Sequence, residues 1–208
     1  MVVKYSIGID EVGRGPLAGP VTLCAVMVEK GAAKNFSEIF RGVRDSKQLT
    51  EKVREKWSKI AKSEKEKGAI QFSISSVQNF TIDKIGLARA VRRALKNCLK
   101  KLEVIPSECE IFLDGSLYAP KEFKNQKTII GGDSKVKIIS LASVIAKVHR
   151  DRKMARLSKK YPGYGFEIHK GYGTKLHYKS LKKWGVSEIH RKSFLHSLPT
   201  ASPQVIHS

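Results

Sequence analysis

Hydrophobic positions along this chain change their period several times, and each change predicts a structural element. Short apolar runs at 5–9 and 21–28 contain branched side chains and predict buried strands. At 70–77, apolar residues alternate with Gln and Ser, a pattern typical of a half-buried strand. Further apolar runs at 110–114 and 127–130 predict two more strands, so we expect a sheet of five.

Longer segments carry apolar residues at steps of three or four, the period of an α-helix. The first, 51–67, follows Thr50, a residue type that caps helix N-termini, and ends at Gly68. The second spans 81–103 and combines an apolar stripe with a basic outer face, and the third spans 138–160. Strands separated by helices predict an open α/β sheet whose functional site lies beyond the strand ends.

Acidic residues stand at the ends of several predicted strands. Asp10 and Glu11 end the first strand, Asp114 ends the fourth, and Asp133 follows the fifth. Neighbouring carboxylates repel each other unless a cation compensates them, and oxygen ligands without clustered Cys or His favour Mg²⁺ or Mn²⁺ over Zn²⁺. These acids are therefore candidate metal ligands, although Asp-Gly and Gly-Asp pairs also occur in ordinary turns.

Asp10 and Glu11 are adjacent in the chain, so the alternation of side chains along a strand bears on their roles. Because neighbouring side chains on a regular strand point to opposite faces, Asp10 and Glu11 cannot both face one site unless the strand is distorted. The pattern therefore favours Asp10 as a bridging metal ligand over the Glu11 side chain as a direct one. A further acid, Asp151, lies between Arg150 and Arg152 on a predicted helix, and we expect it to form structural ion pairs.

A glycine-rich turn with a single arginine follows the first strand, from Gly13 to Pro20. Glycine permits close backbone approach, and consecutive amides in such a turn form a concavity for anionic oxygen. The segment matches neither a P-loop nor a dinucleotide fingerprint. The amides around Gly13, Arg14 and Gly15 are instead candidates for binding an anionic oxygen such as that of a phosphate backbone. The alternative is a turn with a purely structural role.

The charge balance narrows the class of partner. The 208 residues include 40 Lys and Arg against 19 Asp and Glu, giving a net charge of +21. Such a charge predicts a polyanionic partner, nucleic acid first, although an anionic membrane surface fits the charge alone. No apolar run approaches the roughly 18 residues of a spanning helix, and the first residues lead directly into a strand. We therefore expect a soluble, cytoplasmic protein.

Cysteines and histidines do not indicate a metal site of their own. Cys24, Cys98 and Cys109 are widely spaced and include no Cys-x-x-Cys pair, so we expect them to be small core residues. The six histidines lie mostly among Lys and Arg without helical ligand spacing. We expect the histidines at the surface or against phosphate.

Sequence blocks in the order of one known family run through most of the chain. They are Gly8–Pro20, Asp45–Leu49, Leu113–Gly115, Gly132–Lys135, Ala142–Arg152 and Lys170–Thr174, and the likeness extends to about Phe194. Together they resemble ribonuclease HII, the type 2 ribonuclease H family. The resemblance implies a ribonuclease H-like mixed five-stranded sheet flanked by helices, with a C-terminal helical extension from about residue 161.

The resemblance also implies an activity and the residues that carry it. Such an enzyme is an endonuclease that hydrolyses the RNA strand of RNA/DNA hybrids. It also cuts 5′ of single ribonucleotides in duplex DNA, by two-metal-ion catalysis with Mg²⁺ or Mn²⁺ that leaves a 3′-hydroxyl and a 5′-phosphate. Four acids match the family's catalytic and metal-binding residues: Asp10, Glu11, Asp114 and Asp133. Six residues match its nucleic-acid contacts: Gly13, Arg14, Gly15, Ser46, Lys47 and Tyr172.

Two other interpretations stay open at this stage. Ribonuclease HIII, a sister family, has the same acids but usually carries an additional N-terminal domain and a lysine where this chain has Arg14. A basic nucleic-acid-binding protein without catalysis fits the charge but leaves the acids at strand ends unexplained.

Domain and assembly expectations are simple. We expect one catalytic domain over 1–208, with a flexible tail from about 199, and a monomer. The segment 202–208 lacks the paired aromatic residues of a sliding-clamp motif, so we expect no clamp partner through it.

Overall fold

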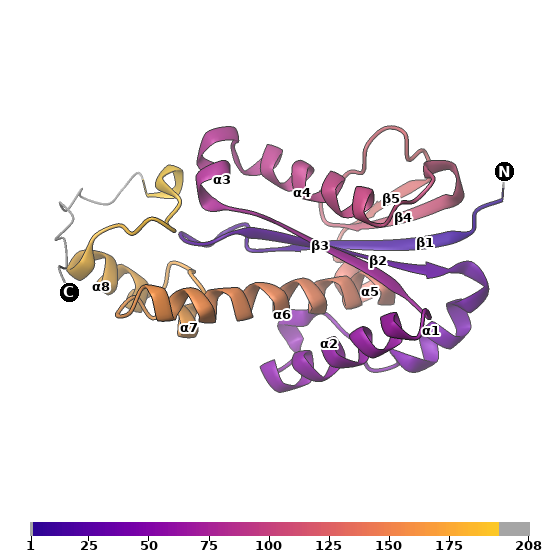
Figure 1. Ribbon diagram of the computed structural model, residues 1–208, viewed down its shortest axis with the longest axis horizontal. Helices are drawn as coiled ribbons and strands as arrows, with labels where there is room; N and C mark the ends of the chain where they lie inside the picture. Colours follow the sequence, from indigo (N-terminus) through magenta and orange to yellow (C-terminus); the bar gives the residue numbers. More distant parts are fainter. Residues whose placement is uncertain (1, 196–208) are drawn as a thin grey trace.

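The computed structural model describes residues 2–195 and contains a mixed sheet with helices on both faces (Figure 1). Its strands are β1 (Tyr5–Val12), β2 (Val21–Glu29), β3 (Gln71–Val77), β4 (Cys109–Asp114) and β5 (Gln126–Ile129). They lie in the order β3-β2-β1-β4-β5. β1 is antiparallel to β2 and parallel to β4, which is in turn parallel to β5. The predicted mixed five-stranded sheet is confirmed.

Helices cover the two faces unequally. They are α1 (Ala33–Ile39), α2 (Glu51–Glu66), α3 (Asn79–Ile85), α4 (Leu87–Lys101), α5 (Gly132–Lys135), α6 (Lys137–Lys160), α7 (Phe166–His169) and α8 (Lys175–Trp184). Figure 1 shows α3 and α4 on one face, α1, α2 and α6 on the other, and α7 and α8 beyond one end of the sheet. Separate apolar clusters fill the two interfaces with the sheet, and a third holds α7 and α8 against α6.

Close packing of α6 on β1 depends on Gly8. A Cβ atom at Gly8 would lie 2.6 Å from the carbonyl carbon of Ile138, closer than a side chain can approach. The missing side chain lets the start of α6 lie directly on the central strand. This contact places Ser143 of α6 beside Asp10 of β1.

The structure confirms some predicted helix limits and corrects one. Thr50 caps α2, and its hydroxyl oxygen accepts a hydrogen bond from the Val53 amide at 3.4 Å. The single helix predicted over 81–103 is wrong, because two helices meet there at Gly86. Gly86 has φ +81° and ψ 155°, a backbone conformation that is essentially restricted to glycine. The apolar period continues across the break, so periodicity alone does not detect it.

The half-buried face predicted for β3 is also reversed. Ser73 and Ser75 are buried beneath α4, and the Ser73 hydroxyl donates to the Cys98 carbonyl at 2.8 Å. Phe72 and Ile74 are only partly buried on the other face. Packing of α4 buries the small polar side chains, because a helix can approach the strand closely there. All three cysteines are free and buried, as expected.

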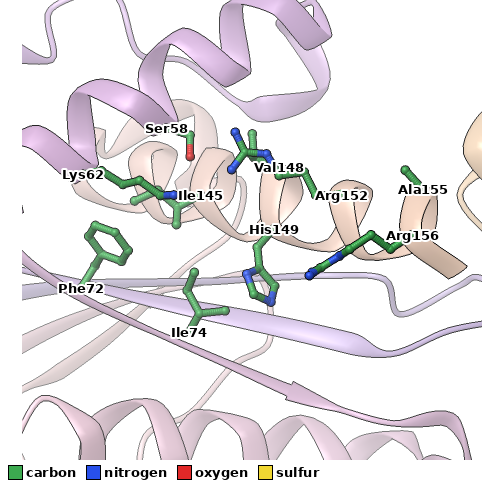
Figure 2. A pocket seen from close by; sticks show the side chains of 10 residues that line it. All are labelled: Ser58, Lys62, Phe72, Ile74, Ile145, Val148, His149, Arg152, Ala155 and Arg156. Carbon is green, nitrogen blue, oxygen red and sulfur yellow. The ribbon is translucent and has the colours of Figure 1, made fainter.

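Phe72 and Ile74 form the floor of a pocket between α2 and α6 (Figure 2). Basic side chains from α6, including Arg152 and Arg156, surround this apolar floor. The lining contains none of the predicted site residues, so this hollow is separate from the candidate site described below. Within residues 2–195, no helix has both the length and the apolar character needed to cross a membrane.

Candidate metal and nucleic-acid site

Three carboxylates converge where β1 and β4 run side by side. Ile9 pairs with Leu113 in the parallel ladder, so the following residues, Asp10 and Asp114, are neighbours on the α6 face of the sheet. Asp133 joins them from α5, and its amide donates to Asp114 Oδ1 at 3.2 Å. One carboxylate oxygen from each of the three acids lies within 4.8 Å of the others. The three acids therefore form a compact group of hard oxygen ligands.

The elements that carry these acids differ slightly from the predicted ones. Asp10 and Glu11 lie inside β1, which continues to Val12 in regular register with β2. Asp133 is not at a strand end but in the first turn of α5, which follows Gly131 in a left-handed conformation. The short helix, rather than β5 itself, turns Asp133 back toward Asp114.

Glu11 lies outside the three-acid group. Because β1 is regular, its side chain points to the opposite face from Asp10, as the alternation predicts. Glu11 Oε1 accepts a hydrogen bond from Arg14 Nη1 at 3.1 Å. Its other oxygen, Oε2, is buried without a hydrogen-bond partner in the described part of the chain. A buried carboxylate oxygen without a partner costs free energy, so this atom fits a site completed by a cation or bound water.

The negative charge of the three carboxylates is only partly balanced by nearby positive charge. Burial raises the pKa of Asp10 well above its ordinary value, and the neighbouring charges of Glu11 and Asp114 raise it further. Burial and Asp114 likewise raise the pKa of Asp133. Among the described residues, Lys47 forms an ion pair with this group: its Nζ lies 3.4 Å from Asp133 Oδ2, on a side chain that is 80% exposed. The donor set therefore fits a divalent cation, which would favour the ionised form of these carboxylates.

The segment that carries Ser46 and Lys47 is anchored to the protein at Ser46, while Lys47 is exposed. Asp45 accepts a hydrogen bond from the Lys47 amide at 2.9 Å, which closes a short 3₁₀ turn. Ser46 is buried, and Ser143 on α6 donates to its hydroxyl oxygen at 2.8 Å. Sequence reasoning missed Ser143, which lies within a family block and carries a hydroxyl on the face of α6 near Asp10.

The two glycines that flank Arg14 have different surroundings. Gly13 has φ +87°, and a Cβ atom there would lie 2.2 Å from Arg150 Nε. A Cβ atom at Gly15 would meet nothing within 4 Å. Gly13 is therefore required by packing, whereas Gly15 leaves open space on the outside of the turn.

Tyr172 lies close to the same arginine. Its ring centroid is 5.8 Å from Arg150 Cζ and 5.9 Å from Lys147 Nζ, and the residue is 39% exposed. Arg150 is thus near both the turn at Gly13 and the tyrosine. The structure brings Tyr172, which is far from the turn in sequence, to the same part of the surface.

The surface position expected for the histidines is wrong for three of them. His169, His177 and His190 are buried and pack around Phe166 in the C-terminal extension, with edge-on or tilted rings. His177 Nε2 lies 3.0 Å from His190 Nε2, and His177 Nδ1 hydrogen-bonds the Tyr172 carbonyl at 2.9 Å. The sequence did not predict this burial, because the histidines lie among Lys and Arg residues and their burial depends on packing between segments that are distant in the chain.

Asp151 forms ion pairs, as expected, but not with its sequence neighbours. Its partners are Lys147, with Nζ at 2.9 Å, and Arg54, with Nη2 at 3.9 Å. Arg150 instead points into the protein beneath the glycine-rich turn.

Comparison with known families decides the relationship of this chain. The family model described as ribonuclease HII matches residues 7–197. The chain belongs to the ribonuclease HII family. Ribonucleases H are hydrolytic endonucleases that act on RNA paired with DNA, and family membership assigns this type of activity to the chain.

Curated relatives named ribonuclease HII match almost the whole chain. The protein of Caldicellulosiruptor saccharolyticus is 44% identical over 196 residues, which cover 94% of this chain and 89% of the relative. The protein of Prochlorococcus marinus is 44% identical over 193 residues, covering 92% and 88% respectively. Because the family is ribonuclease HII, the ribonuclease HIII interpretation is set aside.

Solved structures share the fold. The ribonuclease HII of Archaeoglobus fulgidus, in a complex with PCNA, aligns with a TM-score of 0.71 at 23% identity, covering 95% of this chain and 98% of that one. Ribonuclease H2 from Pyrococcus horikoshii OT3 aligns with a TM-score of 0.67 at 26% identity, covering 91% and 93%. Bst-RNase HIII in complex with Mn²⁺ has a TM-score of 0.65 at 19% identity, covering 94% and 68%. The ribonuclease HII sheet and its flanking helices are therefore shared with these proteins.

Proposed function

We propose that this ribonuclease HII cuts on the 5′ side of single ribonucleotides embedded in duplex DNA and also hydrolyses the RNA strand of RNA/DNA hybrids. The products are a 3′-hydroxyl and a 5′-phosphate. The observation that carries the proposal is the group formed by Asp10, Asp114 and Asp133, because Asp10 lies only three residues before Gly13, where the glycine-rich turn begins. This arrangement combines a metal-binding group with a backbone concavity for phosphate.

Asp10, Asp114 and Asp133 would hold the divalent metal ions. When bound, such ions activate a water molecule and stabilise negative charge on the attacking and leaving oxygens. Lys47, which reaches Asp133 from the rim, would contact the substrate backbone, and Ser46 would orient that segment through its bond with Ser143. Both Mg²⁺ and Mn²⁺ suit this all-oxygen ligand set.

The turn and Tyr172 would select the ribonucleotide. Open space outside Gly15 allows the sugar-phosphate backbone to approach the amides of the turn. A 2′-hydroxyl, present only on the ribose, would hydrogen-bond there. The exposed part of the Tyr172 ring, held near Arg150, would pack against the same sugar.

Cleavage of labelled duplexes tests the proposal. The substrates are a DNA duplex with one ribonucleotide and the matching all-DNA duplex, each incubated with Mg²⁺, with Mn²⁺ or with a chelator. We expect metal-dependent cutting immediately 5′ of the ribonucleotide and none in the all-DNA duplex. Asp114→Asn should lose at least about a hundredfold in rate, because it removes an oxygen charge from the metal-binding group.

Glu122→Gln is the matched control, since it removes an exposed carboxylate beside Leu99 and Lys100 of α4, and α4 covers the sheet face opposite α6. It should cut at the wild-type rate. Folded wild-type protein that binds the duplex without cutting it under either metal would contradict the proposal and favour a non-catalytic binding role.

A further inference from the structure

Arg191, from the segment after α8, is buried beneath the glycine-rich turn. Its guanidinium donates three hydrogen bonds to backbone carbonyls: to Gly13 at 2.6 Å, to Arg14 at 2.7 Å and to Gly19 at 3.0 Å. The residue is fully buried, with 0% exposure. A planar guanidinium with fixed donors is suited to hold several carbonyls in one orientation.

Arg150 supports the same turn from α6. It donates to the Pro20 carbonyl at 2.9 Å and to the Ala18 carbonyl at 3.2 Å. Within residues 2–195, neither Arg150 nor Arg191 forms an ion pair with a carboxylate. Burial and the nearby Arg150 lower the pKa of Arg191 to about 9, so it stays charged at neutral pH. Two buried cations are thus balanced by carbonyl dipoles of the turn.

The contacts of Arg191 also determine where two amides point. The carbonyl of Gly13 shares a trans peptide plane with the Arg14 amide, and the carbonyl of Arg14 shares one with the Gly15 amide. In a trans peptide the C=O and N–H point in opposite directions. Because both carbonyls point at Arg191, both amides point away from it. In the described part of the chain, neither amide donates a hydrogen bond to protein.

We propose that Arg191 is a positioning residue that aims the Arg14 and Gly15 amides at the 2′-hydroxyl and adjoining phosphate of the substrate ribonucleotide. The inference rests on the proposed function. The cation on the carbonyl side polarises both peptide groups, which strengthens their amides as donors. A lysine at 191 cannot hold the turn in this way, because a single ammonium lacks the planar set of donors.

Steady-state kinetics of Arg191→Lys test this inference. With the single-ribonucleotide duplex we expect KM to rise about tenfold, because misaligned amides lose a hydrogen bond to substrate, while kcat stays within about threefold. Affinity for Mn²⁺, measured without nucleic acid, should not change, because the three acids are untouched. The control is Lys192→Met, which removes an exposed neighbouring charge and should leave KM as in wild type.

Amide hydrogen exchange provides a readout that does not require cleavage. In wild-type protein the Arg14 and Gly15 amides should exchange freely and become protected by the single-ribonucleotide duplex in Ca²⁺. Arg191→Lys should reduce this protection. If the lysine variant does not fold, Arg191→Gln, which keeps a side-chain donor without a buried charge, replaces it.

The two proposals fail in different ways. The catalytic proposal alone is overturned if the wild-type protein does not cleave the duplex but the duplex still protects both amides, and this protection is reduced in Arg191→Lys. A folded Arg191→Lys protein with unchanged KM and unchanged amide protection overturns the inference alone. Loss of kcat together with Mn²⁺ affinity in this variant also overturns it, because the residue would then act on the whole fold.

Discussion

At the level of single residues, the two glycines beside Arg14 serve different purposes. Gly13→Ala should destabilise the protein by about 1–3 kcal/mol, since the added methyl group meets Arg150 and the backbone has φ +87°. Gly15→Ala should leave stability unchanged, because the added group enters open space, but should raise KM for the single-ribonucleotide duplex. Urea unfolding and steady-state kinetics measure the two effects. Equal stability losses in both variants would contradict this division.

Without a bound metal, burial and mutual repulsion of the ionised acidic residues destabilise the folded protein. The pKa values of Asp10, Glu11 and Asp133 are raised in the folded protein, chiefly by burial. Folded protein then binds protons more tightly than unfolded protein, so stability falls as pH rises from about 4 through the raised pKa values. Asp114→Asn removes one repulsive charge and should reduce this fall by about 1–2 kcal/mol. Unfolding in chelator between pH 4.5 and 7.5, compared with Glu122→Gln, tests this expectation.

Sequence patterns predicted the acids but not the arginines that organise the turn beside them. Asp10 and Asp114 stand at the end of apolar runs in the sequence and Asp133 comes shortly after one, so this local signal is readable in the chain. Arg150 and Arg191 stand among other basic residues, and their local sequence resembles a solvated face. Their burial depends on carbonyl groups more than a hundred positions away, to which no local pattern refers.

At the level of elements, the strands were predictable because each combines apolar character with clear flanking turns. Shorter or interrupted elements were not, such as α1, which has seven residues, and the junction of α3 and α4. The buried serine face of β3 was missed because α4, rather than the strand sequence, determines which face is covered. Local pattern therefore predicts that an element exists, and packing decides its limits and orientation.

The junction between α3 and α4 should be sensitive to substitution. Gly86→Ala should cost about 1–3 kcal/mol, because the backbone there has φ +81° and ψ 155°, although a Cβ atom would meet nothing within 4 Å. Gly31→Ala is the matched control, since that glycine also has open space around it but no positive φ. Thermal or urea unfolding compares the two. A neutral Gly86→Ala would show that strain at the junction is negligible.

The buried histidines make the C-terminal extension sensitive to acid. Burial lowers the pKa of both His177 and His190 from 6.5 to about 4. Folded protein then binds fewer protons than unfolded protein, so stability is present above pH 6.5 and is lost as pH falls toward 4. His190 alone contributes about 3 kcal/mol to this loss.

Replacing one histidine should therefore reduce the acid sensitivity. His190→Gln should be less stable than wild type at pH 7, and the difference in melting temperature should shrink as pH falls to 4.5. Lys182→Gln, on the exposed side of α8, should follow the wild-type curve throughout. Parallel curves for His190→Gln and wild type would show that His190 does not titrate in this range.

At the level of the whole molecule, the net charge of +21 governs encounter with nucleic acid. Binding that neutralises phosphates releases counterions. In a plot of the logarithm of the binding constant against the logarithm of the salt concentration, each neutralised phosphate adds about −0.9 to the slope. Affinity for the single-ribonucleotide duplex in Ca²⁺ should therefore fall at least tenfold between about 50 and 200 mM salt. Fluorescence anisotropy measures it. An affinity independent of salt would exclude an electrostatic contribution to substrate capture.

The contacts of Arg191 have a consequence for the order of synthesis. The arginine holds Arg14, which lies 177 positions earlier in the chain, and a bridge between Ala18 and His190 closes beside it. Ribosomes release the N-terminal part first, and domains begin to fold as they emerge. A nascent chain that has exposed Asp10, Asp114 and Asp133 still lacks the arginine that shapes the turn. With the role proposed for this turn, recognition of substrate would be among the last properties the growing polypeptide acquires.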